Sequence, residues 1–197
     1  MTPRVVEVAP ERLDRWLAGF AERHGPIDAA EESTPGGIAV RGAAADGSAI
    51  VATPFGYEPL GLILVRRGGY AAGLAFGGSL GACKIGTRHV QSRTAAGGWS
   101  QQRFARRRAH QAEELVGAVI RHARRVLLGE GESPRRAACG IPQGMVLGGD
   151  RTLVRDVLAD PALQALRGLP RREFYDLPDP RRTVLETALR RGRAYRV

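Results

Sequence analysis

The amino-acid sequence predicts one layered domain of the α+β or α/β class, residues 1–197, in which a mixed β-sheet is flanked by helices. A chain of 197 residues fits a single domain, and a hydrophobic content of 43% is enough to fill its core. The hydrophobic spacing runs in the order helix, several antiparallel strands, long helix, then strand, helix, strand and helix. No internal repeat or long linker interrupts this order. We therefore expect an N-terminal helix in residues 1–35, strands in 36–96, a loop at 97–102, a long basic helix at 103–129, and strand and helix elements in 130–197.

Helix and hairpin signals define the N-terminal half. Residues 9–25 carry a proline in the first turn, end in glycine and place four apolar residues on one helical face. Residues 36–55 contain an Asp-Gly turn between two β-rich segments, which predicts a hairpin. Two more strands are expected over residues 60–67 and 69–78, on either side of a glycine turn. The alternating residues 81–94 predict a further, basic strand that leads into a second glycine pair.

The C-terminal half returns to helical spacing. Apolar residues recur every three or four positions until a helix end near Gly129. Residues 137–150 predict one or two short buried strands, and Asp150 is a candidate N-cap for the short helix that follows. Residues 171–178 predict an edge strand, and a final helix is expected to begin near Pro180.

Charge is distributed unevenly along the chain. The net charge is +10, yet residues 1–58 hold five basic and nine acidic residues, and residues 113–197 hold sixteen and eleven. Residues 59–112 between them hold nine basic residues and no acidic one. A basic segment without carboxylates favours contact with a polyanion, most simply a nucleic acid. Codon usage is an alternative, because 29 of the 30 basic residues are arginine; it explains the arginines but not the missing acids.

Several classes of protein are disfavoured by composition. No apolar stretch reaches the roughly 18 residues of a membrane helix, and the N-terminus lacks the apolar segment of a signal peptide. We therefore expect a soluble, cytoplasmic protein without membrane contact. Cys83 and Cys139 match no metal-ligand spacing and are expected to be free, buried thiols. His110 and Glu114 lie one helical turn apart with no third ligand nearby in sequence, so no metal site is expected.

The segment Gly97–Arg108, "GGWSQQRFARRR", joins the predicted basic strand to the long helix. One interpretation is structural: the glycines end the strand, Ser100 caps the helix and the arginines form a solvated face. The other is functional. A glycine pair lets the backbone adopt conformations closed to other residues, and two neutral amides follow it, directly ahead of a cluster of arginines.

This segment resembles the catalytic loop of the eukaryotic and archaeal class-one peptide release factors, in which Gly-Gly-Gln-Ser precedes an Arg-Phe-x-Arg helix start. The preceding strand, with "KIGTRHVQSRT", is also similar to the basic strand of those proteins. The likeness covers most of the chain, most clearly residues 36–130, and the whole pattern is most similar to the stand-alone actinobacterial branch of the Vms-type release-factor-like family. The matching positions in the segment are Gly97, Gly98, Ser100, Arg103, Phe104 and Arg106.

The resemblance implies the fold of the release-factor middle domain, of the ribonuclease-H-like or translational-machinery-component type. It implies a monomer that hydrolyses peptidyl-tRNA on stalled ribosomes, with peptidyl-tRNA and the large-subunit RNA of the peptidyl-transferase centre as partners. Trp99 stands where the release factors carry their catalytic glutamine. Because Vms-type relatives carry a glutamine shifted by one position, Gln101 is the first candidate for the catalytic amide and Gln102 the second. The other residues of the implied catalytic loop are Gly97, Gly98 and Ser100.

An uncharged amide suits this reaction. The bond between a nascent peptide and tRNA is an ester, and its hydrolysis needs an oriented water molecule and a stabilised oxyanion more than a strong base. A glutamine amide offers one acceptor and two donors without charge, so it can hold water near the carbonyl carbon. Backbone N–H groups can stabilise the oxyanion. No tightly bound cofactor is needed, and the sequence shows no triad, carboxylate pair or metal cluster.

Basic and aromatic residues around the segment are candidates for contact with RNA. Arginine forks match phosphate geometry, and such binding weakens steeply with salt. Phe104 is expected in the core under the helix start, with base stacking as the alternative. Trp99 either anchors the loop or stacks on a base. The candidate RNA-binding residues are Lys84, Arg88, Arg93, Trp99, Arg103, Arg106, Arg107 and Arg108.

Other functions stay open on the same sequence. One is a ribosome- or RNA-binding module on this fold that has lost the ester chemistry. Another is a metal-dependent nuclease, which needs clustered carboxylates; the only acids near expected strand ends are Asp46 and Asp150. The junction Val146–Thr152 offers a helix start for a phosphate group, although an ordinary turn explains it as well.

Overall fold

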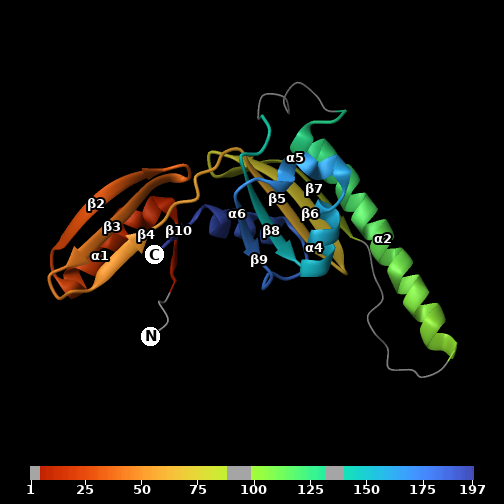
Figure 1. Ribbon diagram of the computed structural model, residues 1–197, viewed down its shortest axis with the longest axis horizontal. Helices are drawn as coiled ribbons and strands as arrows, with labels where there is room; N and C mark the ends of the chain where they lie inside the picture. The colour runs from red at the N-terminus through yellow and green to blue at the C-terminus, as the bar shows by residue number, and fades with distance from the viewer. Residues whose placement is uncertain (1–4, 88–98, 132–139) are drawn as a thin grey trace. The chain divides into compact units, whose positions relative to one another are not determined.

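The computed structural model describes residues 5–87, 99–131 and 140–197, with the backbone alone at 99–105 (Figure 1). The contacts divide the chain into two compact units. The first unit comprises Met1–Tyr57 and Arg190–Val197, and the second comprises Glu58–Leu189. Both units contain strands and helices, so the predicted layered α+β class is confirmed. The organisation as one domain stays a prediction.

The first unit is built from two small sheets and one helix. Its three-stranded antiparallel sheet has the order β2-β3-β4, and β1 pairs with β10, so the two ends of the described chain meet in one small sheet. A 3-10 turn, η1, leads directly into α1. The elements are β1 (Glu7–Val8), η1 (Pro10–Arg12), α1 (Leu13–His24), β2 (Ile27–Thr34), β3 (Gly37–Ala44), β4 (Ala49–Ala52) and β10 (Tyr195–Arg196).

The apolar stripe of α1 forms the core of the first unit. Leu13 is buried, and Trp16 and Leu17 pack against the same cluster, which includes Val40 of β3 and Ala52 of β4. These are residues of the helical face that the sequence predicted. The helix ends where predicted, at Gly25, whose φ of 89° is open to glycine at little cost.

Strand β2 was not predicted from the sequence. Its eight residues, "IDAAEEST", pair with β3 along their whole length, yet six of them are exposed and two are half-buried. A strand solvated on both faces has no reason to alternate apolar and polar residues, so the usual period of two is missing. The predicted helical region 1–35 therefore ends in a strand, whereas the hairpin expected between residues 36 and 55 is confirmed as β3 and β4.

The second unit contains a five-stranded mixed sheet of order β7-β6-β5-β8-β9. Strands β5, β6 and β7 form antiparallel neighbours, whereas β8 and β9 add parallel to β5. The strands are β5 (Leu60–Arg66), β6 (Gly69–Phe76), β7 (Ser79–Thr87), β8 (Gly144–Gly149) and β9 (Arg171–Phe174). The helical elements are α2 (Trp99–Leu128), α4 (Arg151–Leu158), η2 (Pro161–Leu163), α5 (Gln164–Arg167) and α6 (Arg182–Arg193), whose last residues belong to the first unit.

Helices cover both faces of this sheet. On one face, Leu115 and Leu127 of α2 are fully buried in a cluster with residues of β5, β6, β8 and α4. Gly73 of β6 faces the opposite side, because side chains alternate along a strand. A Cβ at Gly73 would lie 2.9 Å from Leu185 of α6, so α6 packs closely on that face. The predicted arrangement of a mixed sheet flanked by helices is confirmed.

Candidate functional site

The predicted site residues fall into three groups. Lys84, Arg106, Arg107 and Arg108 are described with their side chains. Another group lies on the first turns of α2, where only the backbone is described: Trp99, Ser100, Gln101, Gln102, Arg103 and Phe104. Gly97, Gly98, Arg88 and Arg93 lie outside the described residues.

The helix begins earlier than the sequence predicted. Residues 99–102 were expected in a loop, but α2 starts at Trp99. Ser100 is therefore inside the first turn and is not the N-cap of the helix. The physical reason is local: after Gly98 the sequence has no glycine or proline until Gly117, and "SQQRFARRR" contains good helix formers. The proposed catalytic amides consequently stand on a helix start instead of a loop tip.

A helix start changes what the two amides can do. Consecutive helical residues lie about 100° apart around the axis, so Gln101 and Gln102 cannot occupy equivalent positions. The first four backbone N–H groups of an α-helix have no acceptor within the helix, and the dipole places partial positive charge there. This turn thus combines neutral amides with N–H donors suited to a developing oxyanion.

The first described side chains of α2 are not packed like those farther along the helix. Arg106 and Arg107 are exposed, and the first fully buried residue is Leu115. At 1.5 Å per residue, Trp99 lies about 24 Å along the axis from Leu115. Figure 1 shows this end of α2 extending beyond the sheet of its unit. We call residues 99–107 the α2 arm.

Among the described side chains of α2, packing against the rest of the second unit begins at Arg108. This half-buried side chain and Ala112 line a cavity of about 350 Å³ together with Arg67 of the β5–β6 turn and with Asp150 and Asp156 of the α4 region. Acidic groups therefore face Arg108 across the cavity. No such group is described next to the exposed Arg106 and Arg107, which make no ion pair with any other described residue.

Several arginines elsewhere in the chain are paired with acids, in contrast to Arg106 and Arg107. Near the other end of α2, Arg124 donates a hydrogen bond to Glu130 over 2.8 Å and forms an ion pair with it. Arg41 and Arg182 have similar partners, Glu32 and Glu186, at 2.9 and 3.1 Å. The acid-free composition of residues 59–112 thus has a structural counterpart, an arm whose described positive charges are not neutralised.

Lys84 lies apart from the α2 arm. Lys84 is exposed on β7, and its charge acts on His122 of α2. His122 lies about 24 Å along the helix axis from Arg106, so Lys84 is near the packed half of α2. Burial first, and then the charges of Lys84, Arg121 and Arg125, lower the pKa of His122 below its usual 6.5. The structure therefore brings Arg106, Arg107 and Arg108 together but leaves Lys84 beside the packed half of the helix.

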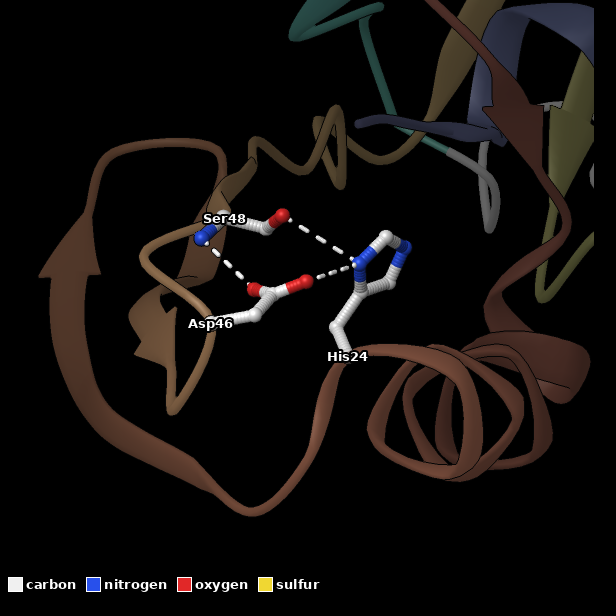
Figure 2. Close-up of polar contacts among 3 residues, drawn as sticks. All are labelled: His24, Asp46 and Ser48. Atoms are coloured by element: carbon white, nitrogen blue, oxygen red, sulfur yellow. Dashed lines mark hydrogen bonds and ion pairs between the residues drawn. The ribbon is translucent and has the colours of Figure 1, made fainter.

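A histidine, an aspartate and a serine meet in the first unit, but they do not form a catalytic triad. Figure 2 shows His24 with Asp46 and Ser48. The Asp46 carboxylate lies 2.8 Å from His24 Nδ1, and Ser48 Oγ lies 3.2 Å from the same nitrogen. A triad needs the acid and the hydroxyl on opposite ring nitrogens. The Ser48 backbone N–H, followed by the His24 hydrogen bond, lowers the pKa of Asp46, so this group ties the end of α1 to the β3–β4 turn.

The other candidate chemistries find no support. Asp46 and Asp150 lie in different units, and Asp150 accepts hydrogen bonds from the backbone N–H groups of Thr152 and Leu153, which confirms it as the N-cap of α4. Its carboxylate fills the place that a phosphate would take, so the junction is an ordinary capped turn. Over the described residues, no three His, Cys, Asp or Glu side chains form a group able to hold a metal ion. Cys83 is a free thiol, as predicted, but only half-buried, and Cys139 lies outside the described residues.

Comparison with protein families shows to which family the chain belongs. The family model "Actinobacteria/chloroflexi VLRF1 release factor" (acVLRF1) matches residues 58–197, which include the whole sheet of the second unit and α2. The chain belongs to this release factor family, so the predicted resemblance to the Vms-type release-factor-like proteins is confirmed. Membership supports a ribosome-related, release-factor-like function. No curated protein matches the sequence significantly. Within the described ranges, no helix is both long and apolar enough to cross a membrane.

Proposed function

We propose that this protein hydrolyses the ester of peptidyl-tRNA and so releases nascent chains from stalled ribosomes. The observation that carries the proposal is the helix start of α2, which combines two neutral amides with a preceding glycine pair and following arginines in a member of a release factor family. The α2 arm extends ahead of the packed core, so it has the form needed to enter a narrow RNA cavity.

The reaction is an attack of water on the ester carbonyl. Gln101 or Gln102 accepts a hydrogen bond from the water through its amide oxygen and holds the water oxygen near the carbonyl carbon. The new C–O bond produces a tetrahedral oxyanion, which backbone N–H groups at the start of α2 stabilise. The bond to the ribose oxygen then breaks, and that oxygen takes up a proton as the tRNA leaves. Ribosomal RNA supplies the remaining surroundings of the ester.

The arginines supply affinity and orientation. Arg103, Arg106 and Arg107 of the arm, followed by Arg108, are spaced so that this end of α2 carries positive charge on several sides. Guanidinium groups bind phosphates with paired hydrogen bonds. Arg106 and Arg107 form no ion pair with a described carboxylate, so no such ion pair has to break before they bind RNA. Lys84, Arg88, Arg93 and Trp99 are proposed as further contacts to RNA.

Peptide release from purified stalled ribosome–nascent-chain complexes tests the proposal. We expect Gln101→Ala or Gln102→Ala to slow release by about 100- to 1,000-fold, as loss of a group that orients or stabilises the transition state does. Gln143→Ala is a matched control, because it removes an exposed amide away from α2. Full activity of both single variants and of the double variant would eliminate the amide mechanism.

A ribosome-binding module without ester cleavage is the second candidate. It is favoured by one observation, the tryptophan at position 99, where the release factors carry their catalytic glutamine. This candidate predicts salt-sensitive sedimentation with ribosomal subunits and no peptide release at any protein concentration. Release by the wild-type protein that depends on either glutamine would exclude it.

A further inference from the structure

The first unit contains a groove of about 760 Å³ that the proposed function does not use. Its walls are η1 and α1 on one side, β1 along the base, and the last turn of α6 opposite. All of its lining residues belong to the first unit. The α1 and β1 walls lie before residue 58, outside the part of the chain that the family model matches.

Arginines line this groove although the N-terminal sequence is acidic overall. Arg12, Arg15 and Arg23 are spaced by three and eight residues, which places them along one side of the η1–α1 segment, and Arg190 lies across the groove. These four residues account for most of the charge on the groove walls. None of the four forms an ion pair with another described residue.

Two neighbouring arginines are used differently. Arg191 binds Glu7 of β1 with Nε 2.8 Å from the carboxylate, and Arg193 binds Glu11 of η1 over 2.9 Å. These ion pairs join the end of α6 to the opposite wall and hold the groove in shape. Glu7, the acid among the lining residues, is thus engaged by Arg191, whereas the other four arginines of the lining form no ion pair with a described residue.

The shape of the groove also favours a ligand. Gly19 lies between Arg15 and Arg23 on the same face of α1 and has no side chain to fill the space. A Cβ there would meet only the Arg23 guanidinium, at 3.6 Å, so the groove is open at this point. Trp16 forms part of the lining and is half-buried, with its ring stacked on Phe20 at 5.7 Å between centroids.

We infer that this arginine-lined groove binds the phosphate backbone of single-stranded RNA. Arg12 and Arg23 are about 16 Å apart along the helical axis, too far for one phosphate group, so the ligand must present several anions in series. Four guanidinium groups that form no ion pair with a described residue match such a backbone. The choice of RNA over an acidic peptide rests on the proposed function, because a protein acting on peptidyl-tRNA in the ribosome works among RNA.

A binding assay without ribosomes tests the inference. The ligand is a fluorescein-labelled 12-nucleotide oligouridylate, and its binding is followed by anisotropy. All variants share the background Arg106→Gln, Arg107→Gln and Arg108→Gln, which weakens RNA binding by this end of α2. The groove variant adds Arg12→Gln, Arg15→Gln and Arg23→Gln. The matched control adds Arg41→Gln, Arg124→Gln and Arg182→Gln, which removes the same charge from arginines already paired with carboxylates.

We expect the groove variant to bind at least tenfold more weakly than the control at low salt. The slope of log affinity against log salt should fall by about 2, as expected for three phosphate contacts to a single strand. Equal losses in the two variants, or no loss in either, would overturn the inference. A 12-residue polyglutamate that binds the groove as tightly as the oligouridylate would overturn the assignment to RNA.

A variant that keeps all charges separates groove occupancy from net charge. Gly19→Leu places a larger side chain in the groove and improves helix propensity, so it should weaken binding several-fold while the thermal midpoint does not fall. Fluorescence gives a second measurement. A Trp99→Phe background leaves Trp16 as the only tryptophan. In this background, the fluorescence of Trp16 should change on RNA binding when Gly19 is kept, and should not change when Gly19→Leu is added. Unchanged affinity and fluorescence response in Gly19→Leu would contradict the inference. Because no peptidyl-tRNA is present, failure here leaves the release activity untouched, and loss of the glutamine effect leaves the groove untouched.

Discussion

The two ends of α2 differ although they form one continuous helix. Toward its C-terminus, Leu115 and Leu127 are fully buried against the sheet, and Arg124 is paired with an acid. Toward its N-terminus, Arg106 and Arg107 are exposed and have no described acidic partner. One end of the helix therefore contributes to folding, and the other end is free to contribute to recognition.

This difference follows from what each end can bury. An amphipathic face is stabilised by the apolar area that it removes from water, and among the described side chains of α2 that face begins at Ala112. Arg106 and Arg107 of the α2 arm are exposed and gain little from packing, so the helical form there depends on continuity with the packed half. Sequence changes in the arm are thus expected to alter function with little effect on folding, and changes in the packed half to do the reverse.

The largest effect on stability is expected in the packed half. Leu127→Ala deletes a fully buried side chain in the cluster between α2 and the sheet. Its removal should lower the free energy of unfolding by about 2 to 5 kcal/mol, through lost burial and the cavity left behind. Denaturant unfolding measures this. Arg107→Ala in the arm is the comparison and should change the same quantity by less than about 0.5 kcal/mol. Similar losses in the two variants would mean that the arm is packed after all.

A smaller effect, on binding alone, is expected in the arm. Arg106→Gln with Arg107→Gln removes two uncompensated charges and should weaken binding to the large ribosomal subunit by about tenfold near physiological salt. The control is Arg124→Gln with Arg182→Gln, whose arginines are already paired. Sedimentation over a series of salt concentrations distinguishes the pairs, since only the arm variant should show a reduced salt dependence. Identical salt dependence in both would refute a specific role for the arm.

The smallest effect is a dependence of stability on pH in the packed half. The pKa of His122 is lowered in the folded protein, mainly by burial, so below about pH 6.5 the unfolded chain takes up the proton more readily and the folded state loses stability. The His122 ring stacks on the Tyr70 ring with 5.6 Å between the ring centroids. His122→Phe keeps an aromatic ring at this position and removes the titratable group. This variant should show a flatter stability profile than the wild type between pH 7 and 5.

A pH profile in His122→Phe that matches the wild type would show that the histidine is not responsible. Glu11 and Asp46 are carboxylates whose pKa is lowered in the folded protein, and both affect stability at a lower pH than this window. The lowered pKa of Asp46 affects stability only below its usual value of 3.8, where protonation removes a contribution that is present at higher pH.

Much of the fold was predictable where one face of an element is buried. The hydrophobic face of α1, the hairpin at Asp46, the strands on either side of Gly68 and the cap at Asp150 all left clear local patterns, and the structure confirms them. Strand β2 left none, because both its faces are solvated. The short pairing of β1 with β10 joins residues almost two hundred positions apart, and no local pattern specifies such a contact.

The candidate site was predictable in composition but not in geometry. The glycine pair, the two amides and the arginines were visible in the sequence, and the family match agrees with the resemblance they carry. The start of α2 lies at Trp99, whereas the sequence predicted it at residue 103. The prediction was wrong because a helix boundary depends on a few residues that tolerate several backbone conformations. The arginine-lined groove was missed altogether, since its walls come from opposite ends of the chain and only the fold brings them together.

The most direct test of the central claim is the single-turnover rate of peptide release at saturating protein, with stalled ribosome–nascent-chain complexes as substrate. If an amide in the first turn of α2 presents water to the ester, Gln101→Ala or Gln102→Ala will lower this rate by about 100-fold or more without changing half-saturation. Arg106→Gln with Arg107→Gln will do the opposite, raising half-saturation and leaving the limiting rate intact. Wild-type limiting rates in both glutamine variants and in the double variant would contradict the account.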